Sequence, residues 1–182
     1  AYEEMKTLAL ALFAQGMTTT VNALTQLMRL HQITCGHTKL DDGTEIDIPT
    51  NRVTEMMSVI EETSGKAIIW SGYRHDIESI KLALQKEYGM AAVGTYYGDT
   101  DDEERRRVVR EFQDPDSELR FFVGNPRTGG YGLTLTAAST VVYFSNSFDL
   151  EVRLQSEDRA HRIGQTKSVT YVDLFVPGTI DE

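Results

Sequence analysis

The sequence predicts an α/β domain with a mainly parallel sheet, preceded by a helical segment. From Lys66 onward, short apolar runs alternate with amphipathic stretches of helix length. This alternation is typical of a parallel sheet that helices cover on both faces. Before Lys66, apolar residues recur at intervals of three and four, as they do along helices. A chain of 182 residues is long enough to bury one substantial core.

The N-terminal third of the chain is expected to be mostly helical. A helix is predicted from residue 2 to about residue 35, with a weak point at Gln15-Gly16 where the apolar spacing is interrupted. Residues 37–52 are expected to form a short loop or hairpin, because Asp41-Asp42-Gly43 is a turn signal. A second amphipathic helix is predicted at 53–63.

The predicted organisation is a helical linker at 1–64 followed by an α/β domain at 65–182. Strands are predicted at 67–70, 91–96, 119–123, 140–144 and 169–176. Helices are predicted at 74–88, 100–112 and 149–162. Thr100 and Glu103 have the spacing of a capping box at the start of the second of these helices. Functional loops should follow the carboxyl ends of the strands.

The charge of the chain limits what it can bind by itself. The chain carries 18 basic and 28 acidic side chains, a net charge of −10, whereas domains that grip nucleic acid strongly are normally basic. We therefore expect weak DNA binding, either through a local cationic surface or through a contact shared with another part of a larger protein. The single cysteine excludes an internal disulfide, and Cys35 with His37 offers two ligands where a structural zinc needs four.

The sequence also predicts where the protein works. It contains neither an apolar run of roughly 20 residues that would span a membrane nor a signal peptide. We expect an intracellular protein, in the cytoplasm or associated with the nucleoid, with no membrane partner and with a monomeric state.

The chemically most informative segment is the predicted helix at 149–162. If all of it is helical, Gln155, Arg159 and Arg162 lie at positions i, i+4 and i+7, on one face. Two guanidiniums and an amide on one face suit an anion such as a polyphosphate. A neighbouring stripe is expected to anchor the helix to the core; it consists of Leu150, Leu154 and His161.

Each basic segment also has a plainer interpretation. Arginine pairs on helices are commonly solvated or paired with nearby acids, here Glu157 and Asp158. The arginines at 105–107 form either a solvated helix face or a contact to a DNA backbone.

A glycine-rich stretch at 129–132 follows a predicted strand. Glycines there would let the backbone approach a phosphate, although such a cluster is often a simple turn. The chain lacks the G-x-x-x-x-G-K-[ST] phosphate loop. It therefore cannot by itself bind and cleave a nucleoside triphosphate in the usual way.

The run from Leu154 to Gln165, L-Q-S-E-D-R-A-H-R-I-G-Q, resembles the last motif of the Swi/Snf family, the double-stranded DNA-translocating ATPases of helicase superfamily 2. Further segments resemble other blocks of this family, in the same order along the chain. They lie at 27–33, 66–71, 97–112, 128–135 and 141–155. The resemblance covers nearly the whole chain and suggests a bacterial or phage type.

The resemblance implies a fold and a set of site residues. The fold would be the C-terminal RecA-like lobe, a three-layer αβα domain. Arg159 and Arg162 would be arginine fingers facing the ATP γ-phosphate, with Gln155, Gly130 and Gly132 helping to bind the nucleotide. ATP and Mg²⁺ would be held mainly by an N-terminal RecA-like lobe of the same protein. Double-stranded DNA would be contacted by Ser71, Tyr73, Arg127, Thr128 and Asn146.

Two functions from different classes remain open at this stage. In the first, the chain is one half of a DNA-dependent ATPase and is inactive without the N-terminal lobe. In the second, it is a stand-alone, non-catalytic interaction or regulatory module derived from such a lobe. An RNA helicase lobe is a weaker third interpretation, because such lobes normally end in a different motif.

Overall fold

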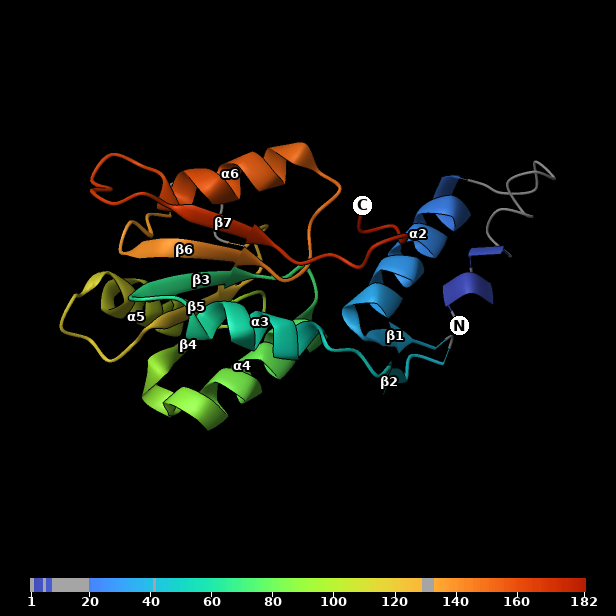
Figure 1. The fold of residues 1–182 in the computed structure, drawn as a ribbon, viewed down its shortest axis with the longest axis horizontal. Helices are drawn as coiled ribbons and strands as arrows, with labels where there is room; N and C mark the ends of the chain where they lie inside the picture. Colours follow the sequence, from blue (N-terminus) through green and yellow to red (C-terminus); the bar gives the residue numbers. More distant parts are fainter. Residues whose placement is uncertain (1, 5, 8–19, 41, 129–132) are drawn as a thin grey trace. The chain divides into compact units, whose positions relative to one another are not determined.

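The computed structural model describes the chain except for residues 1, 5, 8–19, 41 and 129–132. The described chain divides into two compact units (Figure 1). The first contains residues 1–52 and 175–182, and the second contains residues 53–174. The predicted weak point at Gln15-Gly16 lies outside the described residues.

The first unit consists of a helix, a hairpin and the C-terminal stretch. Helix α2 spans Thr20–Cys35, and an antiparallel pair follows, β1 at His37–Lys39 and β2 at Glu45–Asp47. This pair confirms the hairpin predicted within 37–52. Asp181 ties the C-terminal stretch to the unit, because its carboxylate accepts a hydrogen bond of 2.7 Å from Arg52.

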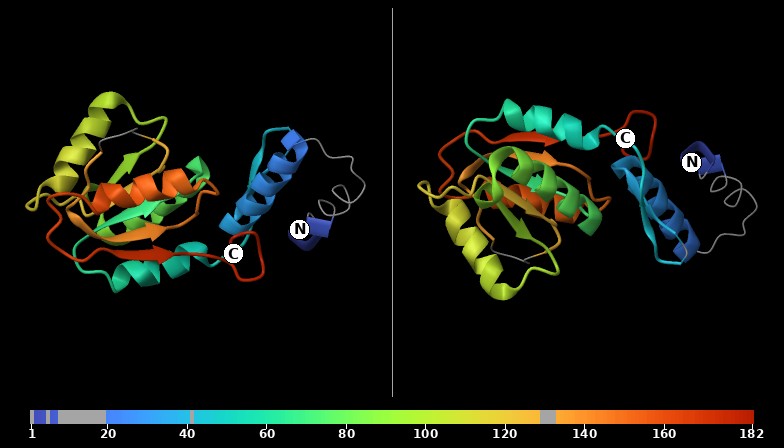
Figure 2. Two further views of the ribbon diagram at one scale, coloured as in Figure 1. Left: turned by 90° about the horizontal axis from the view of Figure 1, so that it is seen from above. Right: turned by 90° about the horizontal axis from the view of Figure 1, so that it is seen from below.

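The second unit is built on a five-stranded sheet in which every neighbouring pair is parallel, with the order β4-β5-β3-β6-β7 (Figures 1 and 2). The strands are β3 (Lys66–Trp70), β4 (Val93–Tyr96), β5 (Phe121–Gly124), β6 (Ala138–Tyr143) and β7 (Thr170–Asp173). The central strands read as continuous apolar runs, because both faces of the sheet are covered. The predicted α/β fold with a parallel sheet is confirmed.

Helices cover both faces of this sheet and produce three layers. The helices are α3 (Arg52–Glu61), α4 (Arg74–Tyr88), α5 (Asp102–Gln113) and α6 (Leu150–Ala160). Residues of α3 and α4 share one buried cluster with the sheet, whereas α5 and α6 share the other. Helix α5 lies close to β4, since a Cβ at Gly94 would come within 2.7 Å of Val108. Although the sequence assigned α3 to the linker segment, its Met56 and Ile60 are fully buried in the core of the second unit.

Two local predictions need correction. The capping box at Thr100 is displaced by one residue, because the Asp101 carboxylate accepts hydrogen bonds from the backbone N–H groups of Glu103 and Glu104. The Thr100 hydroxyl instead accepts from the N–H of Tyr97, which closes the turn before α5. The strand predicted at 91–96 begins at Val93, after a short 3₁₀ turn at Met90–Ala92.

The predicted helix at 149–162 is also shorter than expected. Helix α6 ends at Ala160, because His161 has the non-helical dihedral angles φ −95° and ψ 80°. Arg162 therefore lies beyond the helix, and the predicted single face of Gln155, Arg159 and Arg162 does not exist. Only Gln155 and Arg159 are placed by α6 itself.

Candidate functional site

Arg159 occupies a buried position in the last turn of α6. Its residue surface is only 4% exposed, and its guanidinium lies over the ring of Trp70, with Cζ 5.3 Å from the ring centroid. Its Nη1 donates a hydrogen bond of 3.2 Å to the backbone carbonyl of Thr128. Burial lowers the pKa of this guanidinium, although an arginine remains charged near neutral pH. The protein thus holds a cation in a fixed place beside the segment that follows β5.

Arg162 is exposed and reaches the other end of the same segment. Its Nη1 donates a hydrogen bond of 3.1 Å to the hydroxyl of Thr134. The two arginines therefore contact residues on either side of 129–132, since Thr128 precedes this stretch and Thr134 follows it. The backbone N–H of Leu135 adds a third connection by donating to the Arg159 carbonyl at 2.8 Å.

Gln165 is a residue of this site whose importance sequence reasoning missed. Its side-chain amide donates to the carbonyls of Thr136, Ala138 and Ala160, at 3.0, 2.8 and 3.1 Å. Gly164 makes the preceding turn possible because its φ is +104°, a value that residues other than glycine rarely adopt. Gln165 thereby fastens the end of α6 to the start of β6. The only sequence signal for this role was its place at the end of the Leu154–Gln165 run.

Helix α6 packs on the sheet through residues other than those predicted. The expected anchors Leu150 and Leu154 are 69% and 51% exposed, and His161 is exposed as well. The buried residues of α6 are Ser156, Arg159 and Ala160. Polar side chains can serve here because each is hydrogen bonded, as Ser156 is to the buried hydroxyl of Tyr143 at 2.7 Å. Gln155 is half-buried and donates to Glu151 at 2.8 Å.

The predicted DNA-contacting residues lie at the carboxyl edge of the sheet. Because all five strands are parallel, the segments that follow them meet at one edge. Ser71 and Tyr73 follow β3, Arg127 and Thr128 follow β5, and Asn146 follows β6. The structure thus brings the five residues to a common edge, as the order of strands and motifs in the sequence implied.

Ser71 is fully buried at this edge. Its hydroxyl donates to Asp76 at 2.8 Å and is 2.9 Å from the hydroxyl of Ser145, which in turn accepts from the N–H of Gly72. The structure therefore gives the Ser71 side chain a role in holding the 71–73 loop. A direct contact with a phosphate would require this network to open.

The other predicted residues are accessible. Tyr73 is half-buried and precedes the first residue of α4. The Arg127 side chain is 59% exposed, 3.4 Å from a carboxylate oxygen of Asp149. The Thr128 side chain is half-buried, as is that of Asn146, whose amide is hydrogen bonded to Arg153 and Asp173. Gly130 and Gly132, predicted to bind nucleotide, lie outside the described residues.

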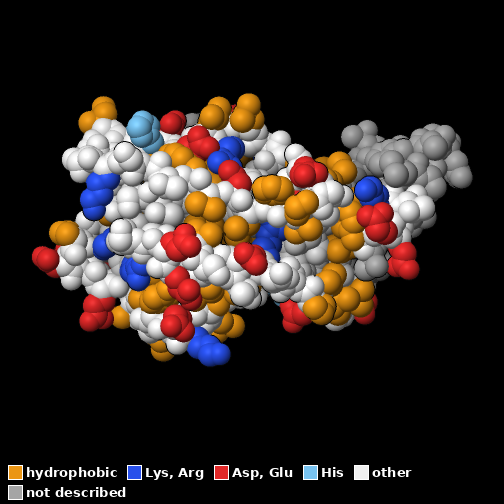
Figure 3. Space-filling model, in the orientation of Figure 1, with side chains coloured by type: hydrophobic (Ala, Val, Ile, Leu, Met, Phe, Trp, Pro, Cys, Tyr) orange, Lys and Arg blue, Asp and Glu red, His pale blue; other side chains and the backbone are white. Residues whose placement is uncertain are grey.

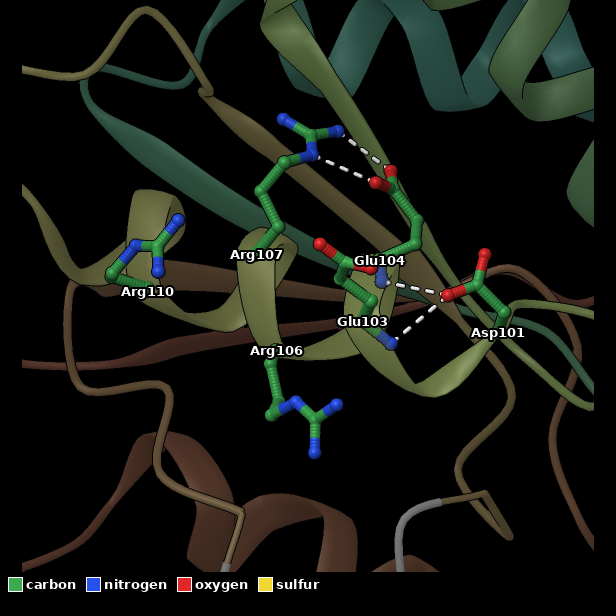
Figure 4. A pocket seen from close by; sticks show the side chains of 6 residues that line it. All are labelled: Asp101, Glu103, Glu104, Arg106, Arg107 and Arg110. Carbon is green, nitrogen blue, oxygen red and sulfur yellow. Dashed lines mark hydrogen bonds and ion pairs between the residues drawn. The ribbon is translucent and has the colours of Figure 1, made fainter.

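The arginines of α5 are arranged differently from those at the end of α6. Arg107 is clamped by Glu104 and Glu111, with contacts of 2.6 Å, and these hydrogen bonds raise its pKa. Figure 4 shows the contact with Glu104. Arg105 donates to the carbonyls of Tyr97 and Gly98 at 2.9 and 3.0 Å. These two arginines are thus committed to the fold. This outcome favours the plainer interpretation of 105–107 for two of its three residues.

Arg106 and Arg110 are exposed, and their side chains make no hydrogen bond or ion pair within the part of the chain that the structure describes. They line an open pocket of about 370 Å³ together with acidic residues at the start of the same helix and at its N-cap, and Figure 4 shows Arg106 directed away from the Arg107 clamp. The acidic side chains of this pocket are those of Asp101, Glu103 and Glu104. Figure 3 shows that both signs of charge are interspersed over the visible face. Among the described residues, no helix is long and apolar enough to cross a membrane.

Comparison with known proteins is consistent with this arrangement. Residues 50–164 match the model of the helicase conserved C-terminal domain. Human chromatin-remodeling ATPase INO80 is 40% identical over 104 residues, which are 56% of this chain and 7% of that protein. The SWI/SNF chromatin-remodeling complex subunit snf22 of Schizosaccharomyces pombe is 40% identical over 85 residues, 47% of this chain and 5% of that protein.

One solved structure extends the likeness to nearly the whole chain. The Sulfolobus solfataricus SWI2/SNF2 ATPase core in complex with dsDNA has a TM-score of 0.74 and 26% identity, covering 99% of this chain and 39% of that one. The C-terminal part of the Fun30 ATPase domain has a TM-score of 0.65 and 25% identity, covering 72% of this chain and 43% of that one.

The match covers more than half of the chain, which therefore belongs to the helicase conserved C-terminal domain family. Within that family its relatives are Swi/Snf-type ATPases, so the resemblance to a superfamily 2 lobe of this type is confirmed. The three-layer fold is accordingly RecA-like. The chain spans 7% or less of the two curated relatives and less than half of the two solved chains.

Proposed function

We propose that the chain is the C-terminal lobe of an ATP-dependent double-stranded DNA translocase or remodeller of the Swi/Snf family. In this proposal it supplies arginine fingers and part of the DNA track, and it is inactive without the N-terminal lobe. The observation that carries the proposal is the pair of arginines at the end of α6. Arg159 and Arg162 are hydrogen bonded to Thr128 and Thr134, on the two sides of the glycine-rich stretch.

This arrangement suits the stabilisation of a phosphoryl transition state. Negative charge develops on the γ-phosphoryl group, and fixed cations stabilise it without having to reorganise. Arg159 supports this role through its burial against Trp70, because burial limits its motion and strengthens its electrostatic effect. Exposed Arg162 is available to reach a nucleotide, and Gln155, Gly130 and Gly132 are proposed to help position it.

The described groups at the end of α6 fit the phosphate part of ATP rather than its metal ion. The two guanidiniums there donate to the Thr128 carbonyl and the Thr134 hydroxyl, whereas Mg²⁺ prefers carboxylate oxygens, substrate phosphates and water. We therefore propose that Mg²⁺ and most of the nucleotide are held by the N-terminal RecA-like lobe of the same protein. Bound ATP would supply the phosphoryl group, and this chain would supply cationic side chains facing it.

Double-stranded DNA is the proposed partner of the carboxyl edge. The Sulfolobus relative was solved with dsDNA, and the edge of this chain carries accessible Tyr73, Arg127, Thr128 and Asn146. Ser71 would act by holding the neighbouring loop. Opening and closing of the cleft between the two lobes would then move them along the duplex. The net charge of −10 supports weak DNA binding by this lobe alone.

Three further expectations are part of the proposal. The protein would act inside the cell and as a monomer. The bacterial or phage type inferred from the sequence also remains a prediction, since the curated relatives named above are eukaryotic.

ATP hydrolysis by a protein that contains both lobes tests the proposal. With duplex DNA present, the two-lobe protein is expected to hydrolyse ATP, whereas this chain alone is not. Arg162→Ala should lower the rate by about a thousandfold, as loss of an arginine finger does. Arg110→Ala is the matched control, because Arg110 is an exposed arginine on the other helix of the same sheet face. A two-lobe protein without ATPase activity would contradict the proposal and favour a non-catalytic module.

A further inference from the structure

Arg153, in the middle of α6, connects the carboxyl edge of the sheet to the helix that carries Arg159. Its side chain is only 20% exposed. Its Nε donates to Glu157 on the same helix at 2.6 Å, and its Nη1 donates to the side-chain oxygen of Asn146 at 2.7 Å. Both terminal nitrogens also reach the carboxylate of Asp173 at the end of β7, with Nη2 at 3.2 Å. One guanidinium thus joins a helix, an edge loop and a strand.

The aromatic ring of Tyr143 fixes the plane of this guanidinium. The Cζ of Arg153 lies 3.6 Å from the ring centroid, which is a stacked cation–π contact. The Tyr143 hydroxyl is 2.7 Å from the Ser156 hydroxyl, which donates to the Arg153 carbonyl at 2.7 Å. Tyr143 of β6 therefore contacts the guanidinium of Arg153 directly and is linked to its backbone carbonyl through Ser156.

The charges in this network stay paired. Burial by itself would lower the pKa of Arg153, but its hydrogen bonds to Asp173 and Glu157 raise the pKa overall. For Asp173 the directions are reversed: burial by itself would raise its pKa, but hydrogen bonds from Arg153 and Asn146 lower the pKa below its ordinary value. Arg153 and Asp173 are thus both ionised at neutral pH.

Arg153 also determines which way the amide of Asn146 faces. The amide oxygen accepts from Arg153, and the amide nitrogen donates to Asp173 at 2.9 Å. An asparagine amide has two N–H groups, so one of them remains available to donate to a phosphate oxygen. A movement of Asn146 toward a ligand would therefore stretch its hydrogen bond to Arg153.

Helix α6 can transmit a displacement of Arg153 to Arg159. Arg153 and Arg159 are six residues apart, about 9 Å along a helix with a rise of 1.5 Å per residue. Every residue between them belongs to α6, which is hydrogen bonded throughout. A shift at Arg153 therefore changes the orientation of the helix end that presents Arg159.

We propose that Arg153 is a positioning residue that couples DNA contact at Asn146 to the placement of the arginines at the end of α6. This inference rests on the proposed function, because it requires DNA at the carboxyl edge and ATP at the end of α6. In this role Arg153 touches neither ligand, and its removal affects the response to DNA more than the hydrolysis that occurs without DNA.

The test is the stimulation of ATP hydrolysis by duplex DNA in the two-lobe protein. For Arg153→Gln we expect the ratio of kcat at saturating DNA to kcat without DNA to fall by about tenfold, the size of one lost charged hydrogen bond. The basal kcat and the KM for ATP should stay within about twofold of wild type. Arg153→Lys keeps the charge but cannot make the several hydrogen bonds of a guanidinium, so its ratio should lie between those of Arg153→Gln and wild type. Arg110→Gln is the matched control and should leave the ratio unchanged.

A double variant separates coupling from a loss of stability. If both residues act through one network, Arg153→Gln combined with Asn146→Ala should lose no more stimulation than the larger single loss. Asp173→Asn perturbs the same network from its partner on β7. Thermal unfolding of each variant checks that it is folded.

Several outcomes would overturn the inference. They are an unchanged ratio in folded Arg153→Gln, an equal fall of basal and stimulated rates, and additive losses in the double variant. A wild-type protein that hydrolyses ATP without any response to DNA would overturn the proposed function together with this inference. Wild-type stimulation that Arg153→Gln retains would overturn the inference alone.

Discussion

Helices α5 and α6 cover the same face of the sheet and both carry arginines, yet these arginines do different things. On α5, Arg107 is neutralised by acids three and four residues away on the same helix. At the end of α6, Arg159 reaches away from its helix, to a carbonyl after β5 and to the ring of Trp70. The comparison teaches that the partner of an arginine, rather than its presence on a helix, decides whether it stabilises the helix or organises a site.

The difference follows from where each helix begins and ends. Helix α5 opens with three acidic residues in its first turn, so acceptors for its arginines are local. Helix α6 ends beside the segment that links β5 to β6, so its last turn has a different part of the chain within reach. A local partner gives a stable helix, and a distant partner ties two elements together.

Among the variants that test this comparison of α5 with α6, Arg159→Lys should have the largest effect. A lysine keeps the charge but cannot both lie over Trp70 and donate in the guanidinium geometry. In the two-lobe protein we expect kcat to fall by about a hundredfold or more, as expected when a transition-state contact is lost. Steady-state ATPase assays measure this change. Wild-type activity in Arg159→Lys would place Arg159 with the structural arginines of α5.

Gln165→Ala should have the next largest effect. It removes the donor that serves three carbonyls at the end of α6 and the start of β6. We expect unfolding to become easier by about 1–3 kcal/mol, because buried acceptors lose their partner. Urea denaturation of this chain measures the loss. A change below about 0.5 kcal/mol would mean that the 160–165 turn does not depend on this side chain.

The N-cap of α5 offers a smaller and purely structural effect. The Asp101 carboxylate accepts from two backbone N–H groups, at 2.9 and 3.0 Å. Asp101→Ala should destabilise this chain by about 1 kcal/mol, the usual cost of a lost cap. The ATPase rate of the two-lobe protein should not change. Thr100→Ala is the control that tests the corrected position of the cap, and an equal loss in both variants would argue against it.

Arg107→Gln should have the smallest effect. Its ion pairs with Glu104 and Glu111 are partly exposed, so we expect a loss of about 0.5 kcal/mol or less, and less still at high salt. Arg107 lowers the pKa of Glu104 through their hydrogen bond. The contribution of this pair is therefore present above the ordinary pKa of 4.5 and is lost as the pH falls through the lower value of the folded protein. Unfolding at pH 7 and in acid compares the variant with wild type.

Much of the fold could be predicted from the sequence because its signals are local. The helix at 74–88, the hairpin within 37–52 and the buried strand ending at Trp70 all follow from periodicity and turn residues. The family motifs in turn indicated Arg159 and Arg162 as candidate site residues without any knowledge of the geometry. The predicted parallel sheet also placed functional loops at the carboxyl ends of the strands, and Ser71, Arg127 and Asn146 lie there.

The errors arose where a contact depends on a distant part of the chain. Helix α6 ends before Arg162, and the chain turns there so that the Gln165 amide donates to the Ala138 carbonyl of β6. Leu150 and Leu154 remain exposed because hydrogen-bonded Ser156 and Arg159 occupy the buried face instead. No periodicity in the sequence distinguishes these outcomes.

By itself, the sequence determined the α/β architecture, the order of its elements and the residues that carry charge, since hydrophobic period and motif spacing are properties of the chain. Only the tertiary structure decided that Arg159 is buried against Trp70, that Gln165 fastens the end of α6, and that Arg153 joins Asn146 to that helix. The physical reason is that a guanidinium or an amide has several donors but no preference for a partner until folding brings acceptors within hydrogen-bonding distance.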